Sequence, residues 1–213
     1  GAGVLDARKA RLLLSLLPAS GAAQVRHGSG VPQSFADVTV AYARLSGFDA
    51  LSQAYGEDQS MAILSDVVAA FDEAAEQHGV EKVRTIGSSY LAASGLSVDR
   101  PDHTARVVEF AREMVRIVRR FNAERGTALT LEVGINTGPV VGGLVGRRKF
   151  IYDLWGDTVR LAREIEDQGA GAIVVTRAVY DRVHESVPFG APRSAELRGH
   201  GVIDLYPVAE GAA

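Results

Sequence analysis

The sequence predicts an α+β fold, and three observations lead to this class. Two long segments, 57–78 and 103–125, space their apolar residues as amphipathic helices do. Shorter segments between and after them alternate apolar and polar residues, as half-buried strands do. The elements follow the order β-α-β-β-α-β-β-α, which is typical of a ferredoxin-like α/β sandwich with additions.

Length and composition set the first limits on function. The chain has 213 residues, of which 46% are hydrophobic and 23% charged, so it can bury one sizeable core. With a net charge of -3, the chain has no overall positive potential that would attract nucleic acid or a membrane surface. We expect neither as a partner of this fragment. There is no cysteine, which excludes disulfides and thiolate metal sites. We expect a cytoplasmic domain. Because the sequence begins at Gly1 rather than at Met, we expect it to be a fragment of a larger protein, and an upstream membrane anchor stays open.

Residues 1–34 are predicted to form a linker, a helix followed by a loop, ahead of a domain that spans 35–213. Pro18 should interrupt or kink the helix, and 28–34 is rich in Gly, Ser and Pro. Two interpretations stay open: a helix packed on its own domain, or a linker that pairs two chains. The leucines that make the helix amphipathic are Leu5, Leu12, Leu13, Leu16 and Leu17.

The domain begins with a strand and a helix. Residues 37–44 direct Val38, Val40 and Tyr42 to one face, which predicts a strand that ends before Gly47-Phe48. The helical segments that follow each present one continuous apolar face. These faces comprise Ile63, Leu64, Val67, Val68 and Phe71 in the first helix, and Val107, Phe110, Met114 and Ile117 in the second.

Between the two helices the sequence predicts a β-hairpin. Val80–Ile86 and Ser89–Ser94 have strand character and flank Gly87-Ser88, which favours a tight turn. The apolar stretch Tyr90–Ala93 is either an exposed dimerisation face or part of the core. Near the C-terminus we expect a strand at 172–175, a helix at 177–183, and strands around 195–197 and 202–208.

The segment 131–166 carries the most specific pattern. Leu131, Val133 and Ile135 alternate as in a strand with one buried face. Gly138-Pro139 predicts a turn, and the Gly-rich run that follows indicates a bulge or a close backbone approach. The remainder comprises a basic loop at 147–149 and a helix with apolar residues Trp155, Val159, Ala162 and Ile165.

Two runs within this segment resemble a known family. Residues 133–146 read VGINTGPVVGGLVG, and residues 152–162 read YDLWGDTVRLA. Both are similar, in order and spacing, to the class III nucleotidyl cyclases, the adenylate and guanylate cyclase catalytic domains. The corresponding family segments read V-G-I-x-x-G-x-V-x-x-G-x-x-G and Y-D-x-W-G-x-x-V-N-x-A-x-R. The leucine run before Pro18 also resembles the L-L-x-x-L-L-P segment that couples many cyclases to an upstream sensor.

The resemblance implies the cyclase type of ferredoxin-like sandwich and a place in cyclic-nucleotide signalling. The family converts ATP or GTP into a 3′,5′-cyclic nucleotide and pyrophosphate. Two divalent ions, Mg²⁺ or Mn²⁺, activate the attacking oxygen and steady the leaving one, and carboxylates hold them. Family domains pair head to tail, so the implied partner is a second cyclase domain, in a homodimer or a heterodimer.

Both positions of the family's metal-binding aspartates hold other residues. The motif F-A-D-[IL]-x-G-F aligns with Y-A-R-L-S-G-F, which places Arg44 at the first aspartate. K-T-I-G-D-x-[YF] aligns with R-T-I-G-S-S-Y, which places Ser88 at the second. A cation and a hydroxyl do not form a two-metal site, so we expect no metal cofactor. The run Phe35-Ala36-Asp37 looks like the first motif, but it begins before the predicted strand and lacks the following Gly-Phe. Asp49 is the only acid expected nearby.

The implied nucleotide-binding positions are changed in most cases. The base-reading Lys and Asp of adenylate cyclases fall on Arg84 and Asp153; Asp153 favours adenine, or else it is a turn or cap residue. The transition-state Asn and Arg fall on Arg160 and Glu164. These two have the spacing of a solvated i,i+4 ion pair, and Glu164 would repel a triphosphate. The phosphate-binding Lys falls on His200, whose charge depends on pH.

These substitutions suggest a catalytically degenerate pseudo-cyclase with little or no activity as a homodimer. Such a domain would act in dimerisation, in regulation or as the partner of another cyclase domain. The alternative is an active or weakly active adenylate cyclase that holds ATP in a metal-poor, arginine-rich site.

Overall fold

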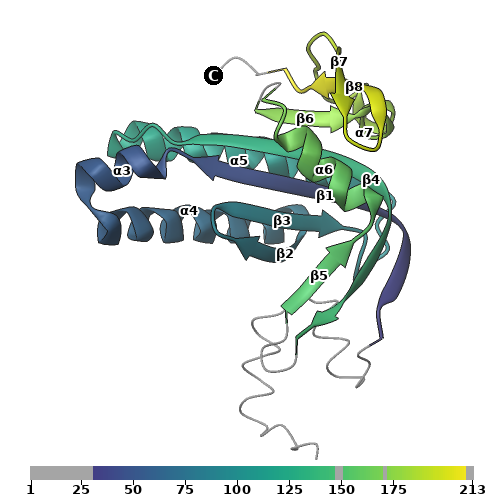
Figure 1. Ribbon diagram of the computed structural model, residues 1–213, viewed down its shortest axis with the longest axis horizontal. Helices are drawn as coiled ribbons and strands as arrows, with labels where there is room; N and C mark the ends of the chain where they lie inside the picture. Colours follow the sequence, from purple (N-terminus) through teal and green to yellow (C-terminus); the bar gives the residue numbers. More distant parts are fainter. Residues whose placement is uncertain (1–30, 147–150, 170–171, 210–213) are drawn as a thin grey trace, which may run out of the picture.

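The computed structural model describes residues 31–146, 151–169 and 172–209, and Figure 1 shows their arrangement. The predicted N-terminal helix and the basic loop lie outside these residues. No helix in the described ranges is long and apolar enough to span a membrane. The elements are β1 (Gln33–Ser46), α3 (Phe48–Tyr55), α4 (Glu57–His78), β2 (Glu81–Ile86), β3 (Ser89–Ser94), α5 (His103–Arg125), β4 (Thr130–Val145), β5 (Ile151–Trp155), α6 (Asp157–Glu166), β6 (Ile173–Thr176), α7 (Arg177–Val183), β7 (Arg193–Leu197) and β8 (Gly201–Pro207).

The strands form one mixed sheet, so the predicted α+β sandwich is confirmed. The strand order is β2-β3-β1-β4-β6-β8-β7, and β5 pairs with β4 outside this path. The pairing of β4 with β6 is parallel, and the other named pairs are antiparallel. Beyond the body of the domain, β5 and the end of β4 extend as an arm (Figure 1).

Alternate residues of β1 serve two separate cores. Ala41, Ala43 and Leu45 belong to the larger core, which also contains the apolar faces of α4 and α5. The opposite side of the strand, with Val40 and Tyr42, belongs to a second core made with β3, the arm and α6. This alternation is the period of two expected for a strand that is covered on both sides.

The two long helices have the predicted bounds because their ends carry local signals. Each ends at a glycine in the left-handed region, Gly79 with φ 69° and Gly126 with φ 65°. The N–H of Val80 then donates to the carbonyl of Ala75 over 2.8 Å, which satisfies one of the last carbonyls of α4. The predicted hairpin is present, and Tyr90–Ala93 belong to the core rather than to an exposed face.

Three local predictions were wrong, and one helix was missed. The chain does not turn at Gly138-Pro139, because β4 is continuous from Thr130 to Val145. Pro139 lies opposite a register shift in β1 between Phe35 and Val38, where its missing N–H breaks no regular ladder. Asp37 therefore lies within β1, at this bulge. Helix α3 was not predicted, and the helix expected from Trp155 begins at Asp157 because Trp155 ends β5.

A glycine in β4 allows helix α6 to approach the sheet. A Cβ atom on Gly134 would collide with the backbone carbonyl of Ala162 and lie 2.8 Å from the backbone nitrogen of Glu166. Both obstacles are backbone atoms, so rotation of a side chain cannot relieve them. The position of α6 over β4 therefore requires glycine at this position.

Gly134→Ala is expected to destabilise the fold by about 1–3 kcal/mol or more, because it overpacks the contact between α6 and β4. Urea unfolding followed by circular dichroism measures this loss. Gly190→Ala is the matched control, because a Cβ there meets its nearest neighbour, the Pro207 ring, at an ordinary 3.5 Å. Equal free energies of unfolding for the two variants would contradict the prediction.

Candidate functional site

Arg44 and Ser88, which the resemblance places at the family's metal positions, lie side by side at the ends of β1 and β3. Arg44 pairs with Ser89 in the sheet register, and the N–H of Leu45 donates to the carbonyl of Ser88 over 3.0 Å. Arg44 and Ser88 are therefore neighbours across these two strands. Their side chains still offer a guanidinium and a hydroxyl, neither of which is a carboxylate ligand.

Arg44 is surrounded by three carboxylates from other parts of the fold. Its Nη2 lies 3.1 Å from Glu132 Oε2 on β4, and its Nη1 lies 2.8 Å from Asp167 Oδ1. Its Nε lies 3.0 Å from Glu166 Oε1 at the end of α6. We refer to Arg44, Glu132, Glu166 and Asp167 as the Arg44 cluster. One cation thus links β1, β4 and the end of α6.

Glu166 is the buried member of the cluster, with 3% of its side chain exposed. Burial raises the pKa of Glu166 to about 7; a hydrogen bond with Asp167 and the charges of Asp167 and Glu132 act in the same direction, while Arg44 opposes them. A carboxylate in this position depends on Arg44 for compensation of its charge.

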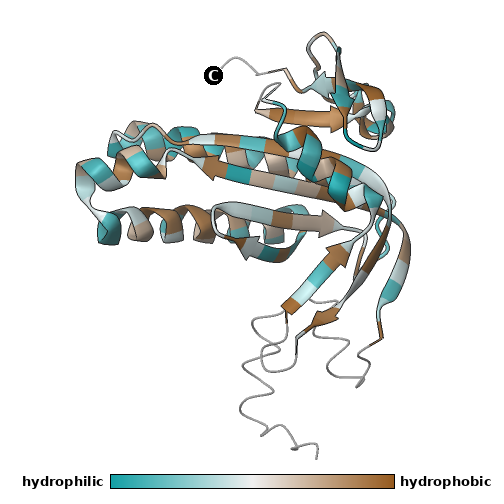
Figure 2. Cartoon of the chain, in the orientation of Figure 1, coloured by the Kyte–Doolittle hydropathy of each residue, from teal (hydrophilic) through white to brown (hydrophobic). Residues whose placement is uncertain are grey.

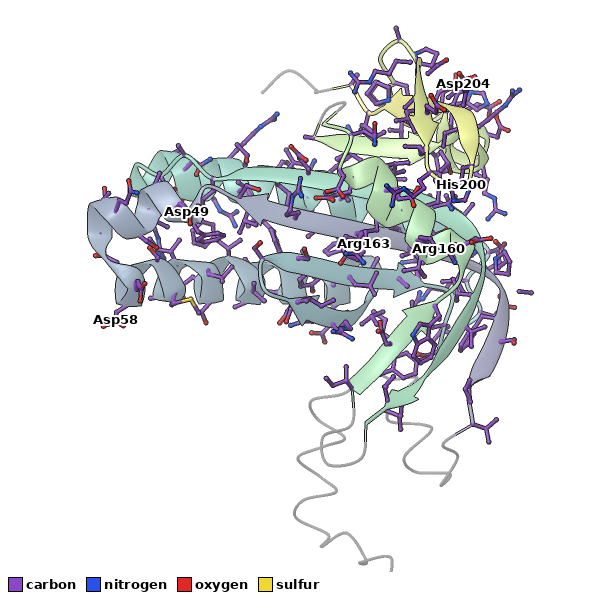
Figure 3. All side chains as sticks on the ribbon, viewed as in Figure 1. Asp49, Asp58, Arg160, Arg163, His200 and Asp204 are labelled. Carbon is purple, nitrogen blue, oxygen red and sulfur yellow. The ribbon has the colours of Figure 1, made fainter. Side chains whose placement is uncertain are left out.

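The residues at this locus do not fit the family's two-metal centre. The three nearby acids are already engaged by Arg44, and no group of acids or histidines in the described ranges is arranged to hold a metal ion. The prediction that Asp49 is the acid close to Arg44 and Ser88 was wrong. Asp49 lies on α3, away from α6 (Figure 3), and the sequence reasoning missed Glu132, Glu166 and Asp167.

Arg84 and Asp153, which the resemblance places at the base-reading positions, form an ion pair. Arg84 Nη1 on β2 lies 2.9 Å from Asp153 Oδ2 on β5, and both side chains are mostly buried. The other oxygen of Asp153 accepts the N–H of Leu154 over 2.9 Å. The cap interpretation of Asp153 is wrong, because the residue before α6 is Gly156 and no side chain caps that helix. Each charge of this ion pair is therefore neutralised by a residue of the same chain.

The transition-state positions lie on α6 and do not pair with each other. Arg160 Nη1 lies 2.9 Å from Asp157 Oδ1, one turn earlier, so the expected partner Glu164 is not the one observed. Glu164 Oε2 is buried and has no hydrogen-bond partner among the described residues. The neighbouring Arg163 places its guanidinium 5.9 Å from the centre of the Tyr42 ring.

His200 lies in the turn between β7 and β8, where its N–H donates to the carbonyl of Leu197 over 3.0 Å. Figure 3 shows this turn above the part of α6 that carries Arg160 and Arg163. The residues expected at the family's active-site positions therefore come from several elements. These are strands from both ends of the sheet, the arm and α6. The arrangement can neutralise anions, but it supplies no free carboxylate pair for cations.

Comparison with known proteins agrees with this fold and with the position of the motifs. Residues 31–210 match the family model described as adenylate and guanylate cyclase catalytic domain. The chain therefore belongs to the family of adenylate and guanylate cyclase catalytic domains. Within it, the chain is similar to an adenylate cyclase of Mycobacterium tuberculosis, with 34% identity over 202 residues that cover 93% of this chain and 46% of the relative. It spans about half the length of that relative.

Two solved structures show the same fold. The guanylate cyclase domain of RhGC from Catenaria anguillulae, in complex with GTP, has a TM-score of 0.77 and 29% identity, over 83% of this chain and 98% of that one. A non-canonical dimeric guanylyl cyclase domain from Blastocladiella emersonii has a TM-score of 0.70 and 26% identity, over 82% of this chain and 94% of that one.

The raised pKa of Glu166 predicts a pH dependence of stability. The pKa of Glu166 is about 7 in the folded state against an ordinary 4.5. Between pH 4.5 and about 7 the carboxyl group is therefore protonated in the folded protein and ionised in the unfolded chain. Its contribution is fully present below pH 4.5 and is lost as the pH rises through about 7, with a slope of at most about 1.4 kcal/mol per pH unit.

Urea unfolding of the parent and of Glu166→Gln across this pH range isolates the contribution, since all other groups are shared. The free energy of unfolding of the parent should fall relative to that of the variant as the pH rises. A constant difference between the two proteins at every pH would contradict the assigned pKa.

Proposed function

We propose that this domain is a catalytically degenerate member of the cyclase family that acts as a dimerisation, regulatory or partner module in cyclic-nucleotide signalling. The observation that carries the proposal is the Arg44 cluster. The position from which the family reaction needs a carboxylate holds a guanidinium, and three acids fix it there at 2.8–3.1 Å. A divalent ion at this locus would be repelled by Arg44 and would have to compete with it for every nearby oxygen.

The remaining positions support the same conclusion. Glu164 brings a negative charge to a helix face where the family places an arginine, and Arg160 already pairs with Asp157. His200 replaces a permanent cation with a group whose charge depends on pH. Each missing electrostatic group typically costs about 10²–10³-fold in rate, so their combined loss leaves little turnover.

The arm offers a surface for pairing with a second domain. Val145 and Ile151 face each other across β4 and β5, and Trp155 lies on the same side of the ribbon. All three are exposed, by 45%, 37% and 39% respectively. Figure 2 shows apolar residues on this projecting part of the molecule. An exposed apolar surface of this kind is suited to contact with a second cyclase domain. The similar domain from Blastocladiella emersonii is described as dimeric.

An active adenylate cyclase with an arginine-rich site remains the second candidate. Arg163 favours it, because this guanidinium lies over Tyr42 and no ion pair engages it in the described ranges. Arginine can neutralise a triphosphate, but it does not readily activate a ribose hydroxyl. Arg44, Arg84 and Arg160 would first have to leave their acidic partners. ATP is therefore a candidate ligand, and turnover is the weaker expectation.

Production of cyclic AMP and cyclic GMP, with Mg²⁺ and then with Mn²⁺, tests the proposal. The parent is expected to be inactive. The reversion Arg44→Asp, Ser88→Asp, Arg160→Asn and Glu164→Arg is expected to gain ATP turnover, because it returns both metal ligands and both transition-state groups. Activity of the parent would establish the alternative, while a folded reversion without activity would show that more than these four positions has changed.

Ile151→Glu is expected to weaken self-association by about 10–100-fold, because it places a charge in the apolar face of the arm. Sedimentation velocity over a concentration series measures the dissociation constant. Val202→Glu on β8 is the control, because Val202 is 70% exposed and lies outside the arm. Equal effects of the two variants would contradict the assigned face, and a parent that stays monomeric would exclude the homodimer.

A further inference from the structure

A buried histidine lies in a polar network that joins four elements of the fold. His103 is the first residue of α5, and only 7% of its side chain is exposed. The side chains connected to it come from β1, β4, α5 and α7. We refer to the whole set as the His103 network; its members are Asp37, Thr39, His103, Thr104, Thr137 and Arg182.

The network lies where β1 passes from the body of the domain to the arm. Before the bulge, Gln33–Phe35 pair with residues 140–142, and after it Val38 pairs with Gly138. Asp37 lies within this bulge, and Thr137 is the residue of β4 that precedes Gly138. The side chains of the network therefore connect β1 to β4 at the base of the arm.

Asp37 determines the proton on one ring nitrogen of His103. His103 Nε2 lies 3.1 Å from Asp37 Oδ2, and Arg182 Nη1 lies 3.1 Å and 3.2 Å from the two oxygens of the same carboxylate. Burial opposes ionisation of this carboxyl group, but hydrogen bonds from His103 and Arg182 lower the pKa of Asp37. An ionised carboxylate only accepts hydrogen bonds, so Nε2 carries a proton.

The threonine hydroxyls determine the proton on the other ring nitrogen. Thr39 Oγ1 lies 2.6 Å from His103 Nδ1 and 3.0 Å from Thr137 Oγ1. Thr137 donates to the carbonyl of Val38 over 3.2 Å, so it accepts from Thr39. Thr39 has then used its only proton, and Nδ1 must donate to it. With a proton on each nitrogen, the ring in this arrangement is an imidazolium cation.

Opposing charges act on this cation. Asp37 on β1 favours it, whereas Arg182 on α7 and the N-terminus of α5 disfavour it. The turn before α5 carries Arg100 and Asp102, and Asp102 is paired with Arg106 at 2.9 Å. From β4 and from the loop after β3, the ring faces an uncharged threonine and a glycine. Histidine is the side chain that ordinarily changes its charge between about pH 5 and 8.

We propose that His103 is a protonation switch for the arm. In the charged state the ring donates to Asp37 and to Thr39, and Thr39 then donates to Thr137 across β1 and β4. Loss of the Nδ1 proton turns the Thr39 hydroxyl toward the ring, so the bond to Thr137 is lost. Asp37 then keeps Arg182 as its one cation in the network, so the base of the arm is held less tightly at high pH than at low pH.

This inference goes beyond the proposed function, because it concerns the order of the arm within one chain and holds whether or not the arm pairs with a second domain. Hydrogen–deuterium exchange of the whole chain, at about pH 5.5 and about pH 8, tests it. The protein is kept below the concentration at which sedimentation velocity detects self-association. Failure of pairing and failure of the switch are therefore distinguishable.

After correction for the intrinsic exchange rate, protection of peptides that cover 33–38 and 138–145 should fall by about fivefold at the higher pH, because a charge-assisted hydrogen bond is lost. Peptides from α4 in the same samples report global unfolding, which includes the effect of Glu166, and should change less. A change of the same size in both sets of peptides would overturn the switch.

His103→Gln should abolish the difference between the two sets, because glutamine offers one donor and one acceptor and takes up no proton. His184→Gln is the matched control, since it removes an exposed histidine that stacks on Tyr180, and it should respond as the parent does. A pH response in His103→Gln equal to that of the parent would overturn the proposal.

Nitrogen-15 NMR of the histidine rings decides without a variant if His103→Gln does not fold. The signal of His103 is identified through its nuclear Overhauser contact with Thr39, which lies 2.6 Å away. Protons on both ring nitrogens at about pH 5.5, and on Nε2 alone at about pH 8, support the switch. A ring with the same protonation at both values would overturn it.

Discussion

The antiparallel pairing of β1 with β4 is the constraint on which the rest of the domain depends. Its register places Tyr42 opposite Gly134 and Arg44 opposite Glu132. The first of these pairs leaves room for α6, because Gly134 has no side chain to hold the helix away from the sheet. The second supplies one of the three acids around Arg44, and the approach of α6 brings the other two. A shift of one residue would turn Arg44 to the opposite face of the sheet, away from the three acids.

The same geometry has different consequences for folding and for chemistry. For folding, the Arg44 cluster compensates a buried carboxylate and links three elements. For chemistry, it engages the three acids that the described part of the chain places beside Arg44. Arg84 with Asp153, and Arg160 with Asp157, repeat this on a smaller scale. These candidate side chains are thus engaged in ion pairs within the chain, which is the basis for proposing a role other than catalysis.

Local features could be predicted from the sequence, and long-range ones could not. Helices α4 and α5 were bounded correctly because their periodicity and terminal glycines are local signals. Arg44 was singled out by a motif, but its partners Glu132 and Asp167 are 88 and 123 residues away, and only the register and the approach of α6 join them. Glu132 alternates with Leu131 and Val133, which identifies its face but not its neighbour across the sheet. The missed α3 has only eight residues and follows Gly47, which predicted only the end of a strand.

Family membership and catalytic competence rest on different residues of this chain. The motif glycines that identify the family are needed for packing: Gly134 admits α6, and a Cβ on Gly142 would collide with the hydroxyl of Tyr152. These requirements hold whether or not a nucleotide is turned over, because they come from backbone and ring positions in the core. The chemistry depends instead on a few side chains at strand ends and on one helix face, where substitution leaves the core intact. A match over 31–210 therefore reports the scaffold, and the proposed loss of catalysis rests on the charges at Arg44 and Glu164.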